Sequence, residues 1–113
     1  MHELSIAQAL VEQVTNLARE SGAGVIRRIT LRIGKLSGVD PEALAAAFPI
    51  AAEETPLAQA ALEMISVEPD VRCRACGRMV EMEFAPVCLH CGSPDLDLKQ
   101  GRELLIESVE WSD

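Results

Sequence analysis

The sequence predicts an α+β fold in which a three-stranded sheet carries two helices on one face, with a four-cysteine module inserted into it. Three observations predict this fold. Apolar residues recur every three or four positions near the N-terminus, apolar and polar residues alternate in later segments, and a stretch punctuated by Gly and Pro holds all four cysteines. We therefore expect residues 1–68 with 102–113 to form one α+β domain, and residues 69–101 to form the module.

The first expected helix covers about residues 4–21, where the apolar spacing is that of an amphipathic helix. Ser5 and Gln8 have the spacing of a capping box, and Gly22 stands where a left-handed C-terminal cap would lie. Residues 1–3 would then lie just outside the helix.

A second helix is expected to begin after Asp40, which would be its N-cap. Pro41 suits the first helical position, and Glu42 places an acidic group in the first turn. Pro49 is expected to kink this helix or end it early.

Three segments read as strands: residues 26–33, 61–68 and 103–111. In the first, the side chains on one face are aliphatic and those on the other are polar, so the strand should be half-buried. The aliphatic set is Ile29, Leu31 and Ile33, and the polar set is Arg28, Thr30 and Arg32.

Composition excludes several classes of protein. The formal charge of −8 and the small number of Lys and Arg residues argue against a nucleic-acid partner, because phosphate neutralisation requires clustered cations. No apolar run is long enough to span a bilayer, and the N-terminus lacks the pattern of a signal peptide, so we expect a cytoplasmic protein. In that reducing compartment the cysteines indicate metal or redox chemistry rather than disulfides.

The cysteines form two Cys-x-x-Cys-Gly turns separated by eleven residues. Each turn can direct two thiolates at one ion, and four thiolates complete the tetrahedral shell of Zn²⁺ without an open position for water. The sequence therefore predicts a structural, zinc-ribbon-like zinc site. Its ligands would be Cys73, Cys76, Cys88 and Cys91.

Other uses of these cysteines fit less well. Inert core packing explains neither the pairing nor the glycines, and a thioredoxin-like redox pair requires a single motif at the start of a helix. His90, inside the second turn, could replace a cysteine as ligand, but we expect it to be exposed or to lie outside the ligand set. Zinc ribbons occur in many kinds of protein, so this module alone does not define a function.

The N-terminus offers a second set of metal donors. The imidazole of His2, the neighbouring amide nitrogen and the free amine of Met1 can form fused chelate rings, and the carboxylate or amide of Glu3 is close enough to add a fourth donor. Nitrogen donors in a tetragonal arrangement suit Ni²⁺ or Cu²⁺. In an arbitrary protein, however, a histidine at position 2 is simply a polar residue on a frayed terminus.

Several motifs taken together favour a metal site at the N-terminus over a frayed terminus. Met-His-Glu-Leu-Ser opens an amphipathic helix, Arg-Ile-Gly-Lys-Leu-Ser-Gly-Val follows at residues 32–39, Asp-Pro-Glu at 40–42, and two Cys-x-x-Cys-Gly turns precede a short C-terminal strand. Over essentially its whole length this arrangement resembles the HypA/HybF family of hydrogenase nickel-incorporation proteins, which are small metallochaperones.

The resemblance implies a nickel site at Met1, His2 and Glu3 and a zinc site at the four cysteines. It also implies a partner nickel-binding GTPase of the HypB type, with which nickel, carried as transient cargo, is delivered to the large subunit of a [NiFe] hydrogenase. Service to urease maturation factors is not excluded. Asp40 could approach the nickel site as an outer ligand, although the N-cap role fits it better. The chain would be a monomer or a homodimer and would have no catalytic residues.

Two other functions were weighed. An enzyme would need an open metal position or a nucleophile with its base, and the sequence offers neither. A zinc-ribbon interaction module without nickel delivery is the main alternative. Arg27, Arg28 and Arg32 form a small basic strip. This strip would either contact an acidic protein partner or remain a solvated face of the sheet.

Overall fold

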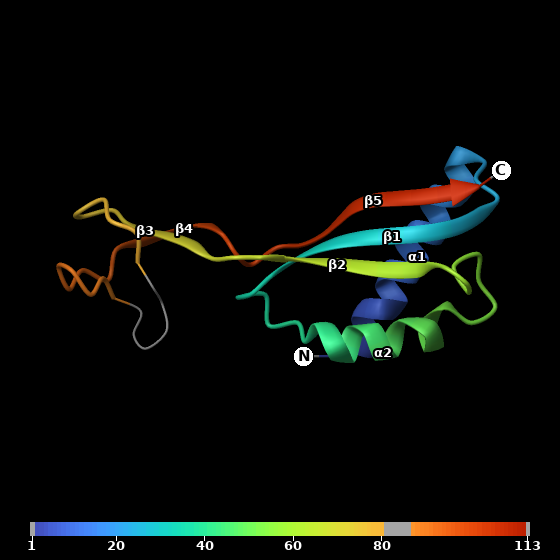
Figure 1. Cartoon of the computed structure of the whole chain (residues 1–113), viewed down its shortest axis with the longest axis horizontal. Helices are drawn as coiled ribbons and strands as arrows, with labels where there is room; N and C mark the ends of the chain where they lie inside the picture. The colour runs from blue at the N-terminus through green and yellow to red at the C-terminus, as the bar shows by residue number, and fades with distance from the viewer. Residues whose placement is uncertain (1, 81–86, 113) are drawn as a thin grey trace.

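The computed structural model describes residues 2–80 and 87–112, and shows an elongated molecule of 55 × 24 × 16 Å. Figure 1 shows a larger part with both helices and a three-stranded sheet, joined by a narrow neck to a smaller part with a two-stranded sheet. The elements in chain order are α1 (Glu3–Ser21), β1 (Val25–Gly34), α2 (Pro41–Ala52), β2 (Ala61–Val67), β3 (Asp70–Cys73), β4 (Leu96–Gln100) and β5 (Leu104–Ser112).

The larger sheet has the order β2-β1-β5, so β1 is its central strand (Figure 1). β1 runs parallel to β2, with Ile29 opposite Leu62, and antiparallel to β5, with Ile29 opposite Val109. The chain therefore leaves this sheet after β2, forms the smaller part, and returns as β5. The three predicted strands and the α+β class are confirmed.

Both helices cover one face of this sheet. Ala7, Leu10 and Val14 of α1 and Leu44 and Phe48 of α2 are buried in a single aliphatic core. The core-facing side of β1 completes it. These strand residues are Ile26, Ile29, Leu31 and Ile33, each at most 3% exposed.

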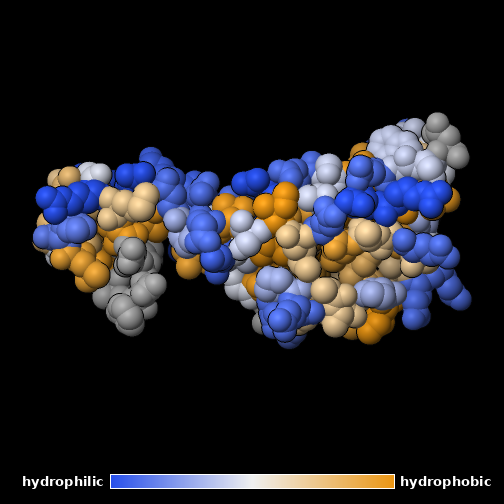
Figure 2. Space-filling view, viewed as in Figure 1, coloured by the Kyte–Doolittle hydropathy of each residue, from blue (hydrophilic) through white to orange (hydrophobic). Residues whose placement is uncertain are grey.

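The opposite face of the sheet carries ion pairs. Arg28 contacts Glu63 at 2.5 Å and Glu110 at 3.3 Å, and Arg32 contacts Glu107 at 3.2 Å. Arg28 and Arg32 of the predicted basic strip are thus already paired with carboxylates of the chain, whereas Arg27 donates to the hydroxyl of Ser112 at 3.0 Å. Because all these side chains are well exposed, each pair is worth at most about 1 kcal/mol. Figure 2 shows the surface of the molecule, with hydrophilic residues concentrated along its upper margin in this view.

The helix ends follow the predictions in part. Gly22 ends α1 in the left-handed conformation (φ 68°), and its amide and that of Ala23 bond to carbonyls of the last turn. Asp40 caps α2 by accepting hydrogen bonds from the amides of Glu42 and Ala43. α2 continues three residues past Pro49, since the missing N–H removes one bond without breaking the packing of the helix on the core.

Two expectations were wrong. The Ser5–Gln8 capping box does not form, because α1 begins at Glu3 with His2 in the N-cap position and no side-chain cap. Glu3 is consequently part of the helix rather than outside it. The strands β3 and β4 were not predicted, because each is short and neither shows a sustained alternation.

At the neck, two backbone segments touch. A Cβ added to Gly34 would lie 2.1 Å from the carbonyl oxygen of Gly101, so no larger residue fits there without displacement. The Leu36 amide donates to that same oxygen at 2.7 Å, and the Lys35 amide donates to the Val67 carbonyl at 3.0 Å. The segment after β1 is thereby tied to both crossings between the larger and the smaller part.

We expect Ile29→Ala to lower the free energy of unfolding of the larger part by about 2–5 kcal/mol, because Ile29 is fully buried against both helices. Urea unfolding followed by far-ultraviolet circular dichroism would measure the change. Ile65→Ala is the matched control, since Ile65 is 40% exposed on the other face of the sheet and should cost less than about 1 kcal/mol. Equal losses in the two variants would contradict the assigned core.

Candidate metal centres

The smaller part presents the four cysteines on two turns with the same hydrogen bonds. Cys73 ends β3; its carbonyl accepts from the Gly77 amide at 2.7 Å, and its amide donates to the Arg78 carbonyl at 2.9 Å. In the second turn the Cys88 carbonyl accepts from Gly92 at 2.7 Å and its amide donates to Ser93 at 2.8 Å. Both glycines have φ 78°, a left-handed conformation that other residues adopt only with strain. The repeated Cys-x-x-Cys-Gly sequence thus folds into a repeated structure.

These turns bring the four sulfur atoms together. All four lie within 4.8 Å of one another, with Cys73 Sγ 3.6 Å from Cys91 Sγ and Cys76 Sγ 3.7 Å from Cys88 Sγ. A tetrahedron with metal–sulfur bonds of about 2.3 Å has sulfur–sulfur edges of about 3.8 Å. The thiols are free rather than disulfide-bonded, and their spacing matches a four-thiolate metal site.

The ionisation of the thiols is coupled. Burial raises the pKa of Cys88, but the amides of Cys91 and His90 outweigh it and bring the pKa to about 7. The Ser93 amide lowers the pKa of Cys91, yet the neighbouring Cys73 sulfur and burial raise it to about 12. Four adjacent thiols cannot all lose their protons without a cation between them, so this cluster is built to ionise around a metal.

A small apolar core supports the cluster. Val71 and Val80 are buried beside Cys73 and Cys88, and Leu96 and Leu98 of β4 pack against them. The pairing of β3 with β4 adds a two-stranded antiparallel sheet. The module is therefore held by side-chain packing and strand pairing as well as by its sulfur ligands.

His90 lies outside the sulfur cluster. Its side chain is exposed, and its Nδ1 is 3.2 Å from Nη1 of Arg78, which follows the first turn. This contact links the two turns on the outside of the module. The expectation that His90 is not one of the clustered donors is confirmed.

The N-terminal donors are described only in part, because Met1 lies outside the described residues. His2 is exposed, and its carbonyl accepts the Ile6 amide at 3.1 Å as the first bond of α1. Its imidazole makes no capping bond. The ring at position 2 is thus accessible to solvent at the beginning of the helix.

Glu3 is held by a contact that sequence reasoning missed. Its carboxylate oxygen Oε2 accepts the backbone amide of Asp40 at 3.2 Å, while the Asp40 side chain caps α2. The beginnings of both helices therefore meet at this pair, where the helix dipoles favour negative charge. Asp40 is an N-cap as expected, and it is also brought beside the N-terminal segment. The sequence shows an acidic residue in the first turn of α1. No local pattern connects that residue with Asp40, which lies 37 positions away.

Comparison with known proteins decides the family. A family model described as "Hydrogenase/urease nickel incorporation, metallochaperone, hypA" matches residues 1–111. The chain belongs to the HypA family. A hydrogenase maturation factor HypA from a Synechococcus species is 43% identical over 110 residues, covering 97% of this chain and 98% of the relative. The HypA of Streptomyces avermitilis is 38% identical, covering 100% and 88% respectively.

Solved structures agree with this assignment. A solution structure of a HypA protein superposes with a TM-score of 0.73 at 26% identity, covering 99% of this chain and 97% of the other. The solution structure of the nickel metallochaperone HypA from Helicobacter pylori gives a TM-score of 0.69 at 26% identity, with coverage of 98% and 97%. The predicted resemblance to nickel-incorporation metallochaperones of hydrogenase maturation is confirmed, as is a four-cysteine metal-binding cluster on an α+β fold. Among the described residues of this HypA-family chain, no helix has the length and apolarity to cross a membrane.

Removal of the metal from the cysteine cluster should unfold the module before the larger part. Treating the metal-loaded chain with excess EDTA is expected to collapse the dispersion of NMR amide signals from residues 70–80 and 87–100, because the closed cluster contributes much of the local folding free energy. Signals of α1 and β1 should persist. Unchanged module signals at full metal loss would show that the apolar core alone maintains the fold.

Proposed function

We propose that this chain binds Ni²⁺ as transient cargo through Met1, His2 and Glu3, and delivers it to the active site of a [NiFe] hydrogenase. In the same proposal, Cys73, Cys76, Cys88 and Cys91 hold a structural Zn²⁺. The observation that carries the proposal is the family match along residues 1–111, which spans both donor sets. The HypA of Helicobacter pylori is described as a nickel metallochaperone, and the Synechococcus relative as a hydrogenase maturation factor.

Zinc fits the cysteine cluster on chemical grounds. Four thiolates with near-tetrahedral spacing leave no coordination position for water or substrate, which is typical of a structural zinc site. Glycine amides fix the shape of both turns, so the donors are largely preorganised. A closed site of this kind retains its ion, and it is unsuited to cargo that must be released.

Nickel fits the N-terminal segment for the opposite reason. The accessible imidazole of His2 and the free amine expected at Met1 are nitrogen donors that Ni²⁺ prefers. The backbone nitrogen of Glu3 is a further candidate, since the first amides of a helix have no partner within the helix. The Glu3 carboxylate is already engaged by the Asp40 amide, and we infer that its main role is to hold the segment against α2.

This arrangement suits cargo transfer. Donors at the end of a chain can be replaced one at a time by incoming ligands, so the ion can pass to a receiver without ever being fully stripped. We propose a nickel-binding GTPase of the HypB type and the hydrogenase large subunit as the proteins that cooperate in this transfer. Urease maturation factors remain a second possible client, since the family description names both enzymes. The chain itself performs no catalytic step in this scheme.

The proposal assigns one metal to each of the two parts of the molecule. Residues 1–68 with 102–113 would form the nickel-binding domain, and residues 69–101 the zinc module. The proposal is compatible with a monomer or a homodimer and assigns the protein to the cytoplasm.

The nickel site is tested by a calorimetric titration of three zinc-loaded samples: the native chain, His2→Ala, and the native sequence extended by Gly-Ser before Met1. We expect only the native chain to bind one Ni²⁺ tightly, because the substitution removes the imidazole and the extension moves the free amine. If all three samples bind alike, the nickel site lies elsewhere. The zinc-ribbon interaction module without nickel delivery would then become the leading function.

A second experiment separates the two roles of Glu3. Glu3→Gln keeps an oxygen that can accept the Asp40 amide, whereas Glu3→Ala removes it. If the carboxylate is an anchor, the Ni²⁺ affinity of Glu3→Gln should stay within about threefold of native, while Glu3→Ala should lose about 0.5–1.5 kcal/mol of stability. A collapse of nickel affinity in Glu3→Gln would instead make the carboxylate a ligand.

A further inference from the structure

Two close contacts between sulfur atoms join the two turns of the cysteine module. Cys73 Sγ lies 3.6 Å from Cys91 Sγ, and Cys76 Sγ lies 3.7 Å from Cys88 Sγ. Each contact connects one cysteine of the first turn with one of the second. Closing either contact to the length of an S–S bond requires the two sulfurs to approach by about 1.6 Å in total, which is a small side-chain movement. Both pairs are therefore placed to form disulfides across the turns.

Each contact pairs an exposed thiol with a buried one. Cys76 and Cys91 are exposed, whereas Cys73 and Cys88 are each 1% exposed. An oxidant in solution thus reaches Cys76 or Cys91 first, and a shielded thiol lies beside it to complete a disulfide. A neighbouring thiol of this kind favours a reversible disulfide over further oxidation of the exposed sulfur to sulfinic acid.

The two turns are also held face to face by contacts that contain no sulfur. The Arg74 amide, inside the first turn, donates to the Asp95 carbonyl at 3.0 Å, and its guanidinium contacts the Asp95 carboxylate at 3.0 Å. Asp95 follows the second turn and leads directly into β4, which pairs with β3. Arg78 and His90 join the turns at another point. The turns therefore stay opposite one another while a sulfur reacts.

The module is separate from the rest of the chain. Figure 1 shows it beyond the neck, at the far end of the molecule from both helices. Its buried residues Val71 and Val80 belong to a core of their own, distinct from the core of the larger part. A change at the sulfurs therefore does not require the larger sheet or the N-terminal segment to rearrange.

We propose that the cysteine module is a reversible peroxide-sensitive switch, in which oxidation joins Cys73 to Cys91 and Cys76 to Cys88 and releases the structural metal. The two disulfides then connect the turns in place of the ion, so the oxidised module stays folded without metal. This inference rests on the proposed zinc site and is independent of nickel binding.

Each disulfide consumes one molecule of hydrogen peroxide. A thiolate of Cys76 or Cys91 attacks one peroxide oxygen, the O–O bond breaks, and the sulfur becomes a sulfenic acid while the departing hydroxide takes up a proton to form water. The thiolate of the buried partner then attacks that sulfur, and the S–O bond breaks with loss of a second hydroxide, which is also protonated. Two thiolates thus lose two electrons, and the peroxide gains them and ends as two waters. Once both disulfides have formed, no thiolate remains to hold the ion.

The test treats the full zinc-loaded chain with hydrogen peroxide and follows zinc release, free thiols and disulfide connectivity. We expect four thiols to be lost and two peroxides to be consumed for each Zn²⁺ released, and dithiothreitol with added Zn²⁺ to restore the starting state. In excess EDTA, the NMR amide signals of residues 70–80 and 87–100 should stay dispersed in the oxidised chain, whereas they collapse in the reduced chain.

The connectivity can be read by peptide mapping, because cleavage sites separate the two cysteines of each turn. Trypsin cleaves after Arg74, and chymotrypsin cleaves after Leu89. After both digestions, disulfides across the turns hold peptides of the first turn to peptides of the second. Disulfides within a turn would hold together only the two halves of that turn.

Two double variants separate this pairing from the alternatives. Cys76→Ser with Cys88→Ser leaves Cys73 and Cys91 in contact, whereas Cys76→Ser with Cys91→Ser leaves Cys73 and Cys88, the two buried thiols. Peroxide should form an intramolecular disulfide at least about tenfold faster in the first variant than in the second. Each variant lacks two of the four sulfurs, so weaker metal binding is common to both.

Disulfides within the turns, sulfinic acids, or disulfides between molecules as the main products would overturn the proposal. Equal rates in the two double variants would do so as well. The zinc content of the untreated chain is measured separately. A chain without Zn²⁺ on its cysteines contradicts the proposed zinc site and the switch with it, whereas a zinc-loaded chain that forms other disulfides contradicts the switch alone.

Discussion

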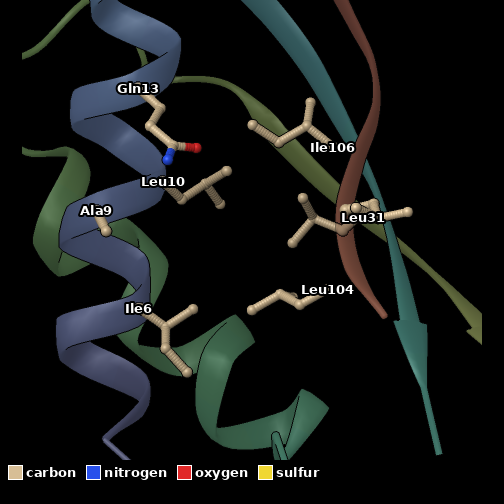
Figure 3. Close-up of a pocket in the computed structure, with 8 residues that line it drawn as sticks. Ile6, Ala9, Leu10, Gln13, Leu31, Leu104 and Ile106 are labelled. Carbon is tan, nitrogen blue, oxygen red and sulfur yellow. The ribbon is translucent and has the colours of Figure 1, made fainter. Parts of the chain in front are cut away.

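The pairing of β5 with β1 is the interaction on which the rest of the molecule depends. β1 alone contacts both other strands of the larger sheet, and its antiparallel partner comes from the opposite end of the sequence. This pairing closes the chain around residues 69–101 and makes the cysteine module an insertion with two anchored ends. It also places the aliphatic residues at the start of β5 beside α1, where an apolar pocket lies between the strands and the helix (Figure 3).

The sequence predicted the parts of the fold that rest on local patterns. Four features could be recognised from residues close together in the sequence, and each was found in the structure. They are the helical period of α1, the alternation in β1, the Asp40-Pro41-Glu42 start of α2 and the two cysteine turns. The start of α1 was misjudged, because the helix begins at Glu3 without a side-chain cap, and the Glu3 carboxylate is bonded to the distant Asp40 amide. β3 and β4 escaped prediction because strands of four and five residues are too short for a visible period.

The two candidate metal centres differ in how well they could be predicted from the sequence. The pairing of the cysteines implied that their sulfurs would meet, and the structure brings them within 4.8 Å. The proposed N-terminal site depends on a free amine and on backbone nitrogens, which every chain possesses. Only the resemblance to a family therefore favoured a metal site there over an ordinary frayed terminus. The approach of Asp40 to this segment was among the expectations, but the hydrogen bond from its amide to the Glu3 carboxylate was not.

The base of the module has a consequence for how the chain folds. Asp70 of β3 pairs with Gln100 of β4, so a folded module holds its own ends one strand spacing apart. Once that pairing and the sulfur cluster have formed, the loop that β5 must close to reach β1 shrinks from residues 68–103 to a few residues, which lowers the entropic cost of closure by about 1–2 kcal/mol. We therefore expect metal loading of the module to favour completion of the larger sheet, and a chain deprived of that metal to expose the apolar face of β5 for longer.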